Sequence, residues 1–181
     1  KENIHNKVEK ELQKTLKEKS KKDARKYDDK ATISCKILLQ YLIPEKEKKK
    51  IVNLLFKKYV SNTEEKFVKK LYLNSNQAKE MIKEGMHFGS HGVGHYWWEY
   101  LTKKGQEKEI IESKKYLNNL GMSQNNFTAC YPYGSYNKST LKILKKNDCK
   151  IGLITKQDVI RNFNINPLLL PRVDTNEIKN N

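Results

Sequence analysis

The sequence predicts an α/β fold with a mostly parallel sheet, preceded by a helical region. Three observations support this prediction. Helix and strand patterns alternate from residue 74 to residue 173, no strand pattern occurs before residue 85, and 181 residues suffice for one domain with a substantial core. We therefore expect a helical region over residues 1–73 and an α/β region over residues 74–181.

The helical region is charged and nearly free of glycine and proline. Ile4, Val8, Leu12 and Leu16 recur at a spacing of four, which predicts a helix with a narrow apolar stripe. Three further helices are predicted at 33–43, 45–60 and 63–73. Pro44 separates the first two of them, because proline is unfavourable inside a helix.

The α/β region begins with a capped helix. Asn74 occupies the N-cap position, Gln77 the capping-box position, and Gly85 follows the last turn. Two further helices are predicted at 104–121 and 138–148, and strands at 86–90, 127–131, 150–155 and 168–173. Parallel α/β folds bind ligands at the carboxyl ends of their strands, where this sequence places His91, a PYG segment and Arg172.

The composition argues against two classes of partner. The formal net charge is +16, but only three of the 37 basic residues are arginines, and the lysines are interspersed with acidic residues. That pattern is typical of solvated helix faces, so we expect no nucleic acid as partner. No apolar run approaches the roughly 20 residues of a membrane-spanning helix.

The three cysteines, Cys35, Cys130 and Cys149, are odd in number and lack C-x-x-C spacing. They predict buried reduced thiols and favour a reducing, cytoplasmic compartment. The first residues show neither an initiator methionine nor an apolar signal-peptide region, so we expect the chain to be part of a longer protein.

Two of the four histidines, His91 and His95, are four residues apart in the segment GSHGVGHYWWEY. On a helical turn or in a tight loop, both imidazoles can face one metal ion. The spacing alone also fits two polar loop residues without a ligand. A catalytic zinc-type site needs a third protein ligand beyond these two.

The residues around this pair resemble the NodB-type polysaccharide deacetylases, carbohydrate esterase family 4. His91 and His95, after the segment MHFGS, match the second family motif, H-S/T-x-x-H. Pro132, Tyr133 and Gly134 match the third, R-x-P-Y/F-G. The resemblance implies an irregular (β/α) barrel, of which this chain contains the C-terminal, larger part together with a helical N-terminal region.

The resemblance also implies a chemistry. Family members hydrolyse the N-acyl amide of an amino sugar or polysaccharide with a divalent metal, here expected to be zinc. The resemblance implies that His91 and His95 are metal ligands. It also implies that the backbone N–H of Tyr133 donates a hydrogen bond to the oxyanion. Pro132 and Gly134 shape the substrate loop, and Trp97 is a candidate for stacking on a sugar ring, with core or rim packing as the alternative.

Three features depart from the family pattern. The first motif, T-F-D-D, is missing, because Asp28-Asp29 lacks a preceding apolar strand and is expected to be a solvated pair. The catalytic aspartates are therefore expected upstream of Lys1. Cys130 replaces the motif arginine, for which Arg172 is a candidate substitute, with an ordinary surface arginine as the alternative. The late general-acid histidine is also absent.

These departures leave two other functions open. One is a degenerate deacetylase fold that binds carbohydrate without hydrolysing it, and the less favoured one is a basic nucleic-acid-binding module. For the isolated chain, the expected deacetylase activity is weak or absent. His87, in the predicted strand at 86–90, is expected to be a core residue rather than a ligand.

Overall fold

The computed structural model describes residues 9–10, 12–15, 17–18, 28–161, 164–175 and 178. Contacts divide the chain into two compact units, Lys1–Tyr72 and Leu73–Asn181. Leu12 lies in a helical segment, whereas Ile4, Val8 and Leu16 of the first predicted helix lie outside the described residues. No helix in the described ranges is both long enough and apolar enough to span a membrane.

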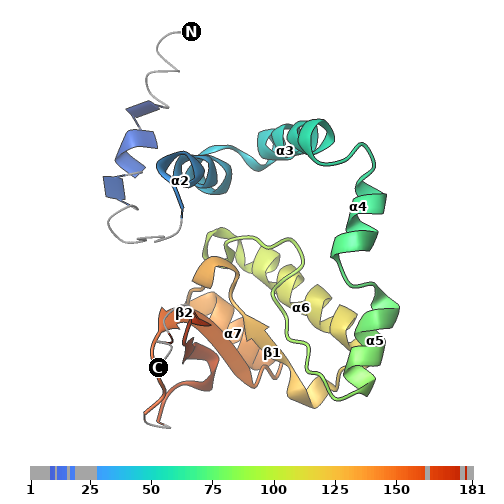
Figure 1. Cartoon of the computed structure of the whole chain (residues 1–181). Coiled ribbons are helices and arrows are strands. Elements are labelled where there is room, and N and C mark those ends of the chain that lie inside the picture. Colours follow the sequence, from blue (N-terminus) through green and yellow to red (C-terminus); the bar gives the residue numbers. More distant parts are fainter. Residues whose placement is uncertain are drawn as a thin grey trace. The chain divides into compact units, whose positions relative to one another are not determined.

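The first unit is helical throughout its described elements (Figure 1). Its helices are α2 (Lys30–Ile37), the π-helix η1 (Leu38–Leu42), α3 (Glu45–Tyr59) and α4 (Glu64–Leu71). The helix predicted at 33–43 begins earlier because Asp29 caps it, with its carboxylate accepting the Thr32 N–H at 2.7 Å. Pro44 then separates η1 from α3.

The second unit contains three longer helices, α5 (Ser75–Lys83), α6 (Lys103–Leu120) and α7 (Lys138–Lys146). The predicted capping box of α5 is confirmed, because Asn74 accepts the Gln77 N–H and Gln77 accepts the Asn74 N–H, each at 2.9 Å. Helix α6 ends at Gly121, which adopts a left-handed φ of 106°.

Three parallel strands form the sheet of this unit, in the order β1-β2-β3. They are β1 (Thr128–Cys130), β2 (Ile151–Gln157) and β3 (Leu170–Arg172). In the described part of this unit, four short 3-10 helices accompany them, namely η2 (Trp98–Tyr100), η3 (Gln124–Asn126), η4 (Pro132–Gly134) and η5 (Pro167–Leu169). The predicted parallel sheet is confirmed, and the start of the strand predicted at 168–173 is instead η5.

The strand predicted at 86–90 is wrong in extent. Only Ser90 pairs with β1, through a single parallel bridge to Ala129. The Ser90 N–H donates to Thr128 O and the Cys130 N–H donates to Ser90 O, each at 2.8 Å. His87 is exposed rather than in the core, and its Nε2 lies 2.8 Å from Thr128 Oγ1.

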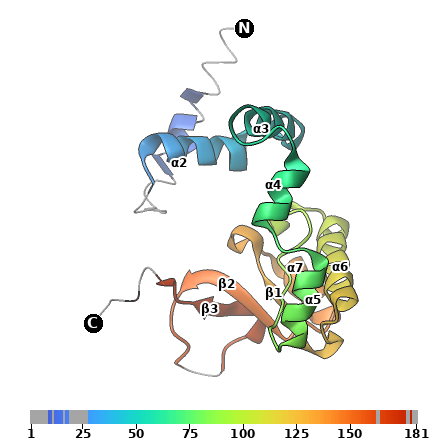
Figure 2. The ribbon, with the colours of Figure 1, turned by 45° about the vertical axis from the view of Figure 1, so that its right-hand side comes forward.

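Helices α5, α6 and α7 lie on one side of the sheet, and the core forms between them and the strands (Figure 2). Trp98, Ile110 and Leu144 are fully buried there. The Tyr131 hydroxyl donates to Leu168 O at 2.6 Å and ties β1 to η5. Burial, with smaller effects of Cys149 and Tyr136, raises the pKa of Tyr131 and keeps this donor protonated.

The cysteines fit the expectation of buried thiols only in part. Cys149 is buried, Cys130 is half-buried and Cys35 is exposed. Burial raises the pKa of the Cys149 thiol to about 11. At pH 8 only about one Cys149 side chain in a thousand is then the reactive thiolate, against about a quarter for an ordinary thiol.

We therefore expect iodoacetamide to alkylate Cys149 about a hundredfold more slowly in the folded chain than in guanidinium-unfolded chain, because only the thiolate reacts. Peptide mass spectrometry of quenched time points measures the rate for each cysteine. The exposed Cys35 is the internal control and is expected to change little. Equal rates for Cys149 in the folded and unfolded chain would contradict its burial.

Candidate active site

The loop from His91 to Trp97 follows the carboxyl end of the sheet. Ser90, which is 3% exposed, pairs with β1 immediately before His91. The loop then ends in η2, whose Trp98 is fully buried in the core. Both ends of the loop are thus fixed by packing, and the histidines between them are exposed.

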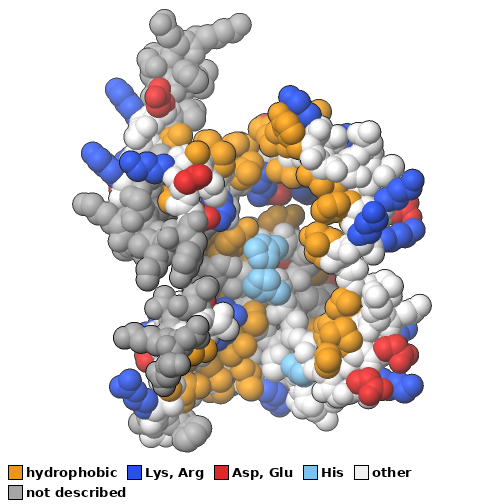
Figure 3. All heavy atoms as spheres, in the orientation of Figure 1, with side chains coloured by type: hydrophobic (Ala, Val, Ile, Leu, Met, Phe, Trp, Pro, Cys, Tyr) orange, Lys and Arg blue, Asp and Glu red, His pale blue; other side chains and the backbone are white. Residues whose placement is uncertain are grey.

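The two histidines meet through their Nε2 atoms, which are 3.1 Å apart. Nδ1 of His91 lies 2.8 Å from Cys130 O. A carbonyl only accepts, so Nδ1 of His91 carries the proton, and Nε2 of the neutral ring presents a lone pair. In Figure 3, two histidine side chains lie against each other on the visible face.

The backbone of His95 has an unusual conformation. Its φ is 53°, in the left-handed region that non-glycine residues seldom adopt. Partial burial of the ring, followed by the neighbouring His91, holds the pKa of His95 below its ordinary value. This shift favours the neutral imidazole, which is the form that ligates a metal.

The pair fits a divalent metal as two of its ligands. Bonds of about 2.0–2.1 Å from one ion to nitrogen atoms 3.1 Å apart meet at about 98°, between the octahedral and tetrahedral angles of about 90° and 109°. The same distance also fits a hydrogen bond between the rings. Among the described residues, no group of three or more His, Cys, Asp or Glu side chains is arranged to hold an ion.

The PYG segment forms the turn η4 beside the histidines. The ring of Tyr133 lies 4.6 Å from that of His95, edge to face, and stacks on Trp97 with centroids 4.4 Å apart and planes 4° apart. The predicted residues His91, His95, Tyr133 and Trp97 are thus brought together. One face of the Trp97 ring is covered by Tyr133, so the alternatives of packing and of stacking on a sugar ring both stay open for Trp97.

The turn has an unusual backbone. Tyr133 has a φ of 57° and Gly134 a φ of 71°, and a Cβ on Gly134 would overlap Thr155 Oγ1 of β2. The hydrogen bonds of the turn run from the Gly134 N–H to Tyr131 O and from the Ser135 N–H to Pro132 O, each at 2.9 Å. Neither of them uses the Tyr133 N–H.

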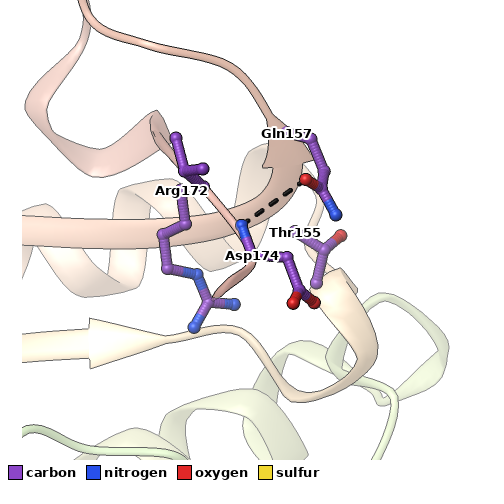
Figure 4. A pocket seen from close by; sticks show the side chains of 5 residues that line it. Thr155, Gln157, Arg172 and Asp174 are labelled. Atoms are coloured by element: carbon purple, nitrogen blue, oxygen red, sulfur yellow. Dashed lines mark hydrogen bonds between the residues drawn. The ribbon is translucent and has the colours of Figure 1, made fainter. Parts of the chain in front are cut away.

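Arg172 lies at the carboxyl end of β3 in a cavity of about 250 Å³ that Thr155, Gln157, Val173 and Asp174 also line. The Nε–H of Arg172 donates to Ile154 O at 3.0 Å, and this hydrogen bond fixes the position of the guanidinium group. Figure 4 shows the side chains of Arg172, Asp174 and Thr155 extending toward one space near the end of β1. Thr155, which lines this cavity, also lies beside Gly134 of the PYG turn.

Asp28 and Asp29, the only adjacent aspartates, make local contacts in the first unit. Asp29 caps α2, and a hydrogen bond to the Thr32 N–H holds its pKa below the ordinary value. Asp28 pairs with Lys36 at 2.6 Å. These contacts agree with the expectation of a solvated pair that stabilises a helix start.

Glu109 is a site residue that the sequence did not reveal. It is only 7% exposed, and Oε2 accepts the N–H groups of Val93 and Gly94, between the two histidines, at 2.8 and 2.9 Å. In the sequence it is one acid among many on a charged helix. The available signal was its place on the buried face of α6 with Ile110 and Ser113, but this face is partly polar and was not decisive by itself.

Comparison with known proteins assigns this fold and loop to a family. Residues 26–152 match the family model described as polysaccharide deacetylase. The match covers more than half of the chain, and the chain belongs to the polysaccharide deacetylase family. This is a family of hydrolases that act on carbohydrate amides. The motif with the two histidines and the PYG motif indicated this class.

Two relatives agree with this assignment. The chain is 34% identical over 87 residues to the putative polysaccharide deacetylase YxkH of Bacillus subtilis (strain 168). The aligned segment covers 48% of this chain and 31% of that protein. The chain is also 35% identical to the Streptococcus pyogenes deacetylase PplD in complex with acetate, with a TM-score of 0.51 over 56% of this chain and 44% of that one. The chain thus spans less than half the length of either relative.

Proposed function

We propose that the chain provides the two-histidine part of a metal-dependent deacetylase site that removes an N-acetyl or similar acyl group from an amino sugar or polysaccharide. The observation that carries this proposal is the 3.1 Å approach of His91 Nε2 to His95 Nε2, with the opposite nitrogen of His91 bonded to Cys130 O. Family membership supplies the class of reaction. Acetate in the complex of the S. pyogenes relative is the acid that this reaction would release.

In this proposal His91 and His95 hold the divalent metal, expected to be zinc. When bound, the metal activates water and polarises the amide carbonyl. The chain's own residues prepare the rest of the site. Cys130 O fixes the proton of His91 on Nδ1, and the loop backbone holds His95 against it. A carboxylate ligand and base are needed beyond these two histidines.

The turn η4 is proposed to face the substrate. Its left-handed backbone at Tyr133 leaves the Tyr133 N–H outside the hydrogen bonds of the turn, where it can donate to the developing oxyanion. Pro132 and Gly134 hold this backbone in shape. Trp97 stacks on Tyr133, and together they form an aromatic wall beside His95 suited to the apolar face of a sugar ring.

The barrel is part of the same proposal. A three-stranded parallel sheet with helices on one side is a segment of the irregular (β/α) barrel that the family resemblance implies. The boundary proposed between the helical region 1–73 and the deacetylase region 74–181 falls next to the division of the contacts at Tyr72 and Leu73.

The proposal is tested by acetate release from N-acetylglucosamine oligomers, measured enzymatically, before and after treatment with EDTA and after addition of Zn²⁺. We expect any release by the chain to stop with EDTA and to return with Zn²⁺. Release that survives complete metal removal would contradict the proposal. Saturable binding of the oligomers in the absence of zinc, with no release of acetate, would instead support the degenerate carbohydrate-binding function.

Arg172 is proposed to orient the catalytic carboxylate in place of the missing motif arginine. Its Nε bond to Ile154 O and its cavity beside the PYG turn support this role. We expect Arg172→Ala to lower zinc-dependent acetate release at least tenfold while zinc affinity changes less than twofold. Arg161→Ala, an exposed arginine in the loop after β2, is the matched control. Measurable zinc-dependent acetate release that equals the release by the unsubstituted chain would remove Arg172 from the site.

A further inference from the structure

Helix α6 contacts the histidine loop with two side chains one turn apart. Glu109 and Ser113 lie at i and i+4, so both project from the same face of the helix. Glu109 Oε2 accepts the Val93 and Gly94 N–H groups, and Ser113 Oγ lies 2.6 Å from Ser90 Oγ. Ser90 Oγ also accepts the Gly92 N–H at 3.2 Å. Three successive N–H groups between the histidines are thereby bonded.

The Glu109 carboxylate is unusual in its surroundings. It is 7% exposed, and within the described ranges it forms no ion pair with a lysine, arginine or histidine. Burying a carboxylate is costly unless strong hydrogen bonds compensate. Two backbone N–H groups donate to Glu109 Oε2 at 2.8 and 2.9 Å, and these bonds compensate for the burial of the carboxylate. The sequence therefore places a buried acidic group directly behind the loop.

The loop backbone fits closely around this carboxylate. Gly92 has a φ of 76°, and a Cβ built on it would lie 2.8 Å from Glu109 Oε2 and 3.1 Å from Trp98 Nε1. The Gly94 N–H that Glu109 accepts belongs to the residue immediately before His95, whose own φ is 53°. At Val93 and Gly94, the conformation that brings His95 to His91 is thus held from behind by the Glu109 side chain.

Resting on the proposed function, we propose that Glu109 is a positioning residue for the metal site. It acts in two ways. It fixes the backbone between His91 and His95 so that the two Nε2 atoms converge, and it places a carboxylate behind the loop whose two histidines hold the cation. Groups that orient metal ligands from behind typically contribute 10- to 100-fold in metal affinity.

The test measures zinc affinity of the full chain by competition with a chromophoric chelator, for Glu109→Gln and for Glu112→Gln as matched control. Glu112 is exposed on the same helix and undergoes the same loss of charge. We expect Glu109→Gln to weaken zinc binding at least tenfold and Glu112→Gln to change it less than twofold. Equal affinities for both variants and the unsubstituted chain would overturn the inference.

A destabilised control variant distinguishes the positioning role of Glu109 from a merely structural role. Ile143→Val removes one methyl group from the core side of α7, where Ile143 is 3% exposed. It is expected to lower the Tm without changing zinc affinity. If Glu109→Gln fails to fold, the zinc-induced rise in Tm of Glu109→Asp replaces the measurement. A rise as large as that of the unsubstituted chain would overturn the inference.

Failure of the proposed function gives a different result. In that case the unsubstituted chain itself would show no zinc affinity above that of His91→Ala. Long-range ¹H–¹⁵N spectra of the imidazoles in zinc-free chain add a readout that needs no metal. We expect Glu109→Gln to change the His91 and His95 ring signals, and Glu112→Gln to leave them in place. Unchanged ring signals in Glu109→Gln would count against the positioning role.

Discussion

Replacing His91 or His95 by alanine is expected to weaken zinc binding by the full chain about a hundredfold or more, because each variant leaves a single imidazole where two converge. In the structure their Nε2 atoms are 3.1 Å apart. Isothermal titration with Zn²⁺ at pH 7.5 measures the affinity.

His87→Ala is the matched control for both substitutions. His87 is exposed, and its Nε2 is 2.8 Å from Thr128 Oγ1, so its ring is engaged outside the pair. We expect its affinity to stay within twofold of that of the unsubstituted chain. A loss in His87→Ala as large as in His91→Ala would mean that zinc binds scattered surface histidines and not the proposed site.

Among the substitutions considered, Gly152→Ala is expected to destabilise the protein most. It should lower the free energy of unfolding of the second unit by about 3 kcal/mol or more. Gly152 is buried in β2, and a Cβ there would overlap Leu168 O and lie 2.5 Å from Tyr131 Oη. The backbone carbonyl cannot move without breaking the hydrogen bond that it accepts from Tyr131. Thermal unfolding followed by circular dichroism should show a Tm lowered by more than about 10 °C.

Gly105→Ala is the control with the opposite expectation. Gly105 is in the first turn of α6, where the nearest atom to a built Cβ is Leu101 Cβ at 3.3 Å. Alanine favours the helix, so the Tm should be unchanged or slightly higher. A Tm of Gly152→Ala equal to that of Gly105→Ala would show that β1, β2 and η5 do not pack as described.

Much of the fold was predictable because local signals agreed with it. The capping residues Asn74 and Gln77 and the helix-ending Gly121 set helix boundaries through interactions within a few residues. The segment 86–90 was misjudged for the opposite reason. Its short apolar run has strand character, but pairing depends on a partner, and only Ser90 reaches β1.

The part of the candidate site that consists of motif residues was predictable from the sequence. The spacing of His91 and His95 and the PYG turn identified residues that the fold brings together with Trp97. The tautomer of His91 was not predictable, because Cys130 O comes from a strand 39 residues away. Glu109 was missed for the same reason, since its partners are backbone N–H groups of a distant loop.

The central claim is that one divalent ion binds between His91 and His95 through their Nε2 atoms. Crystals of the full chain grown with Zn²⁺, with diffraction data collected on both sides of the zinc absorption edge, test it most directly. We expect one anomalous peak at about 2.0–2.1 Å from Nε2 of both residues. A peak on only one of the two rings, or zinc bound elsewhere while the rings remain in mutual contact, would contradict it.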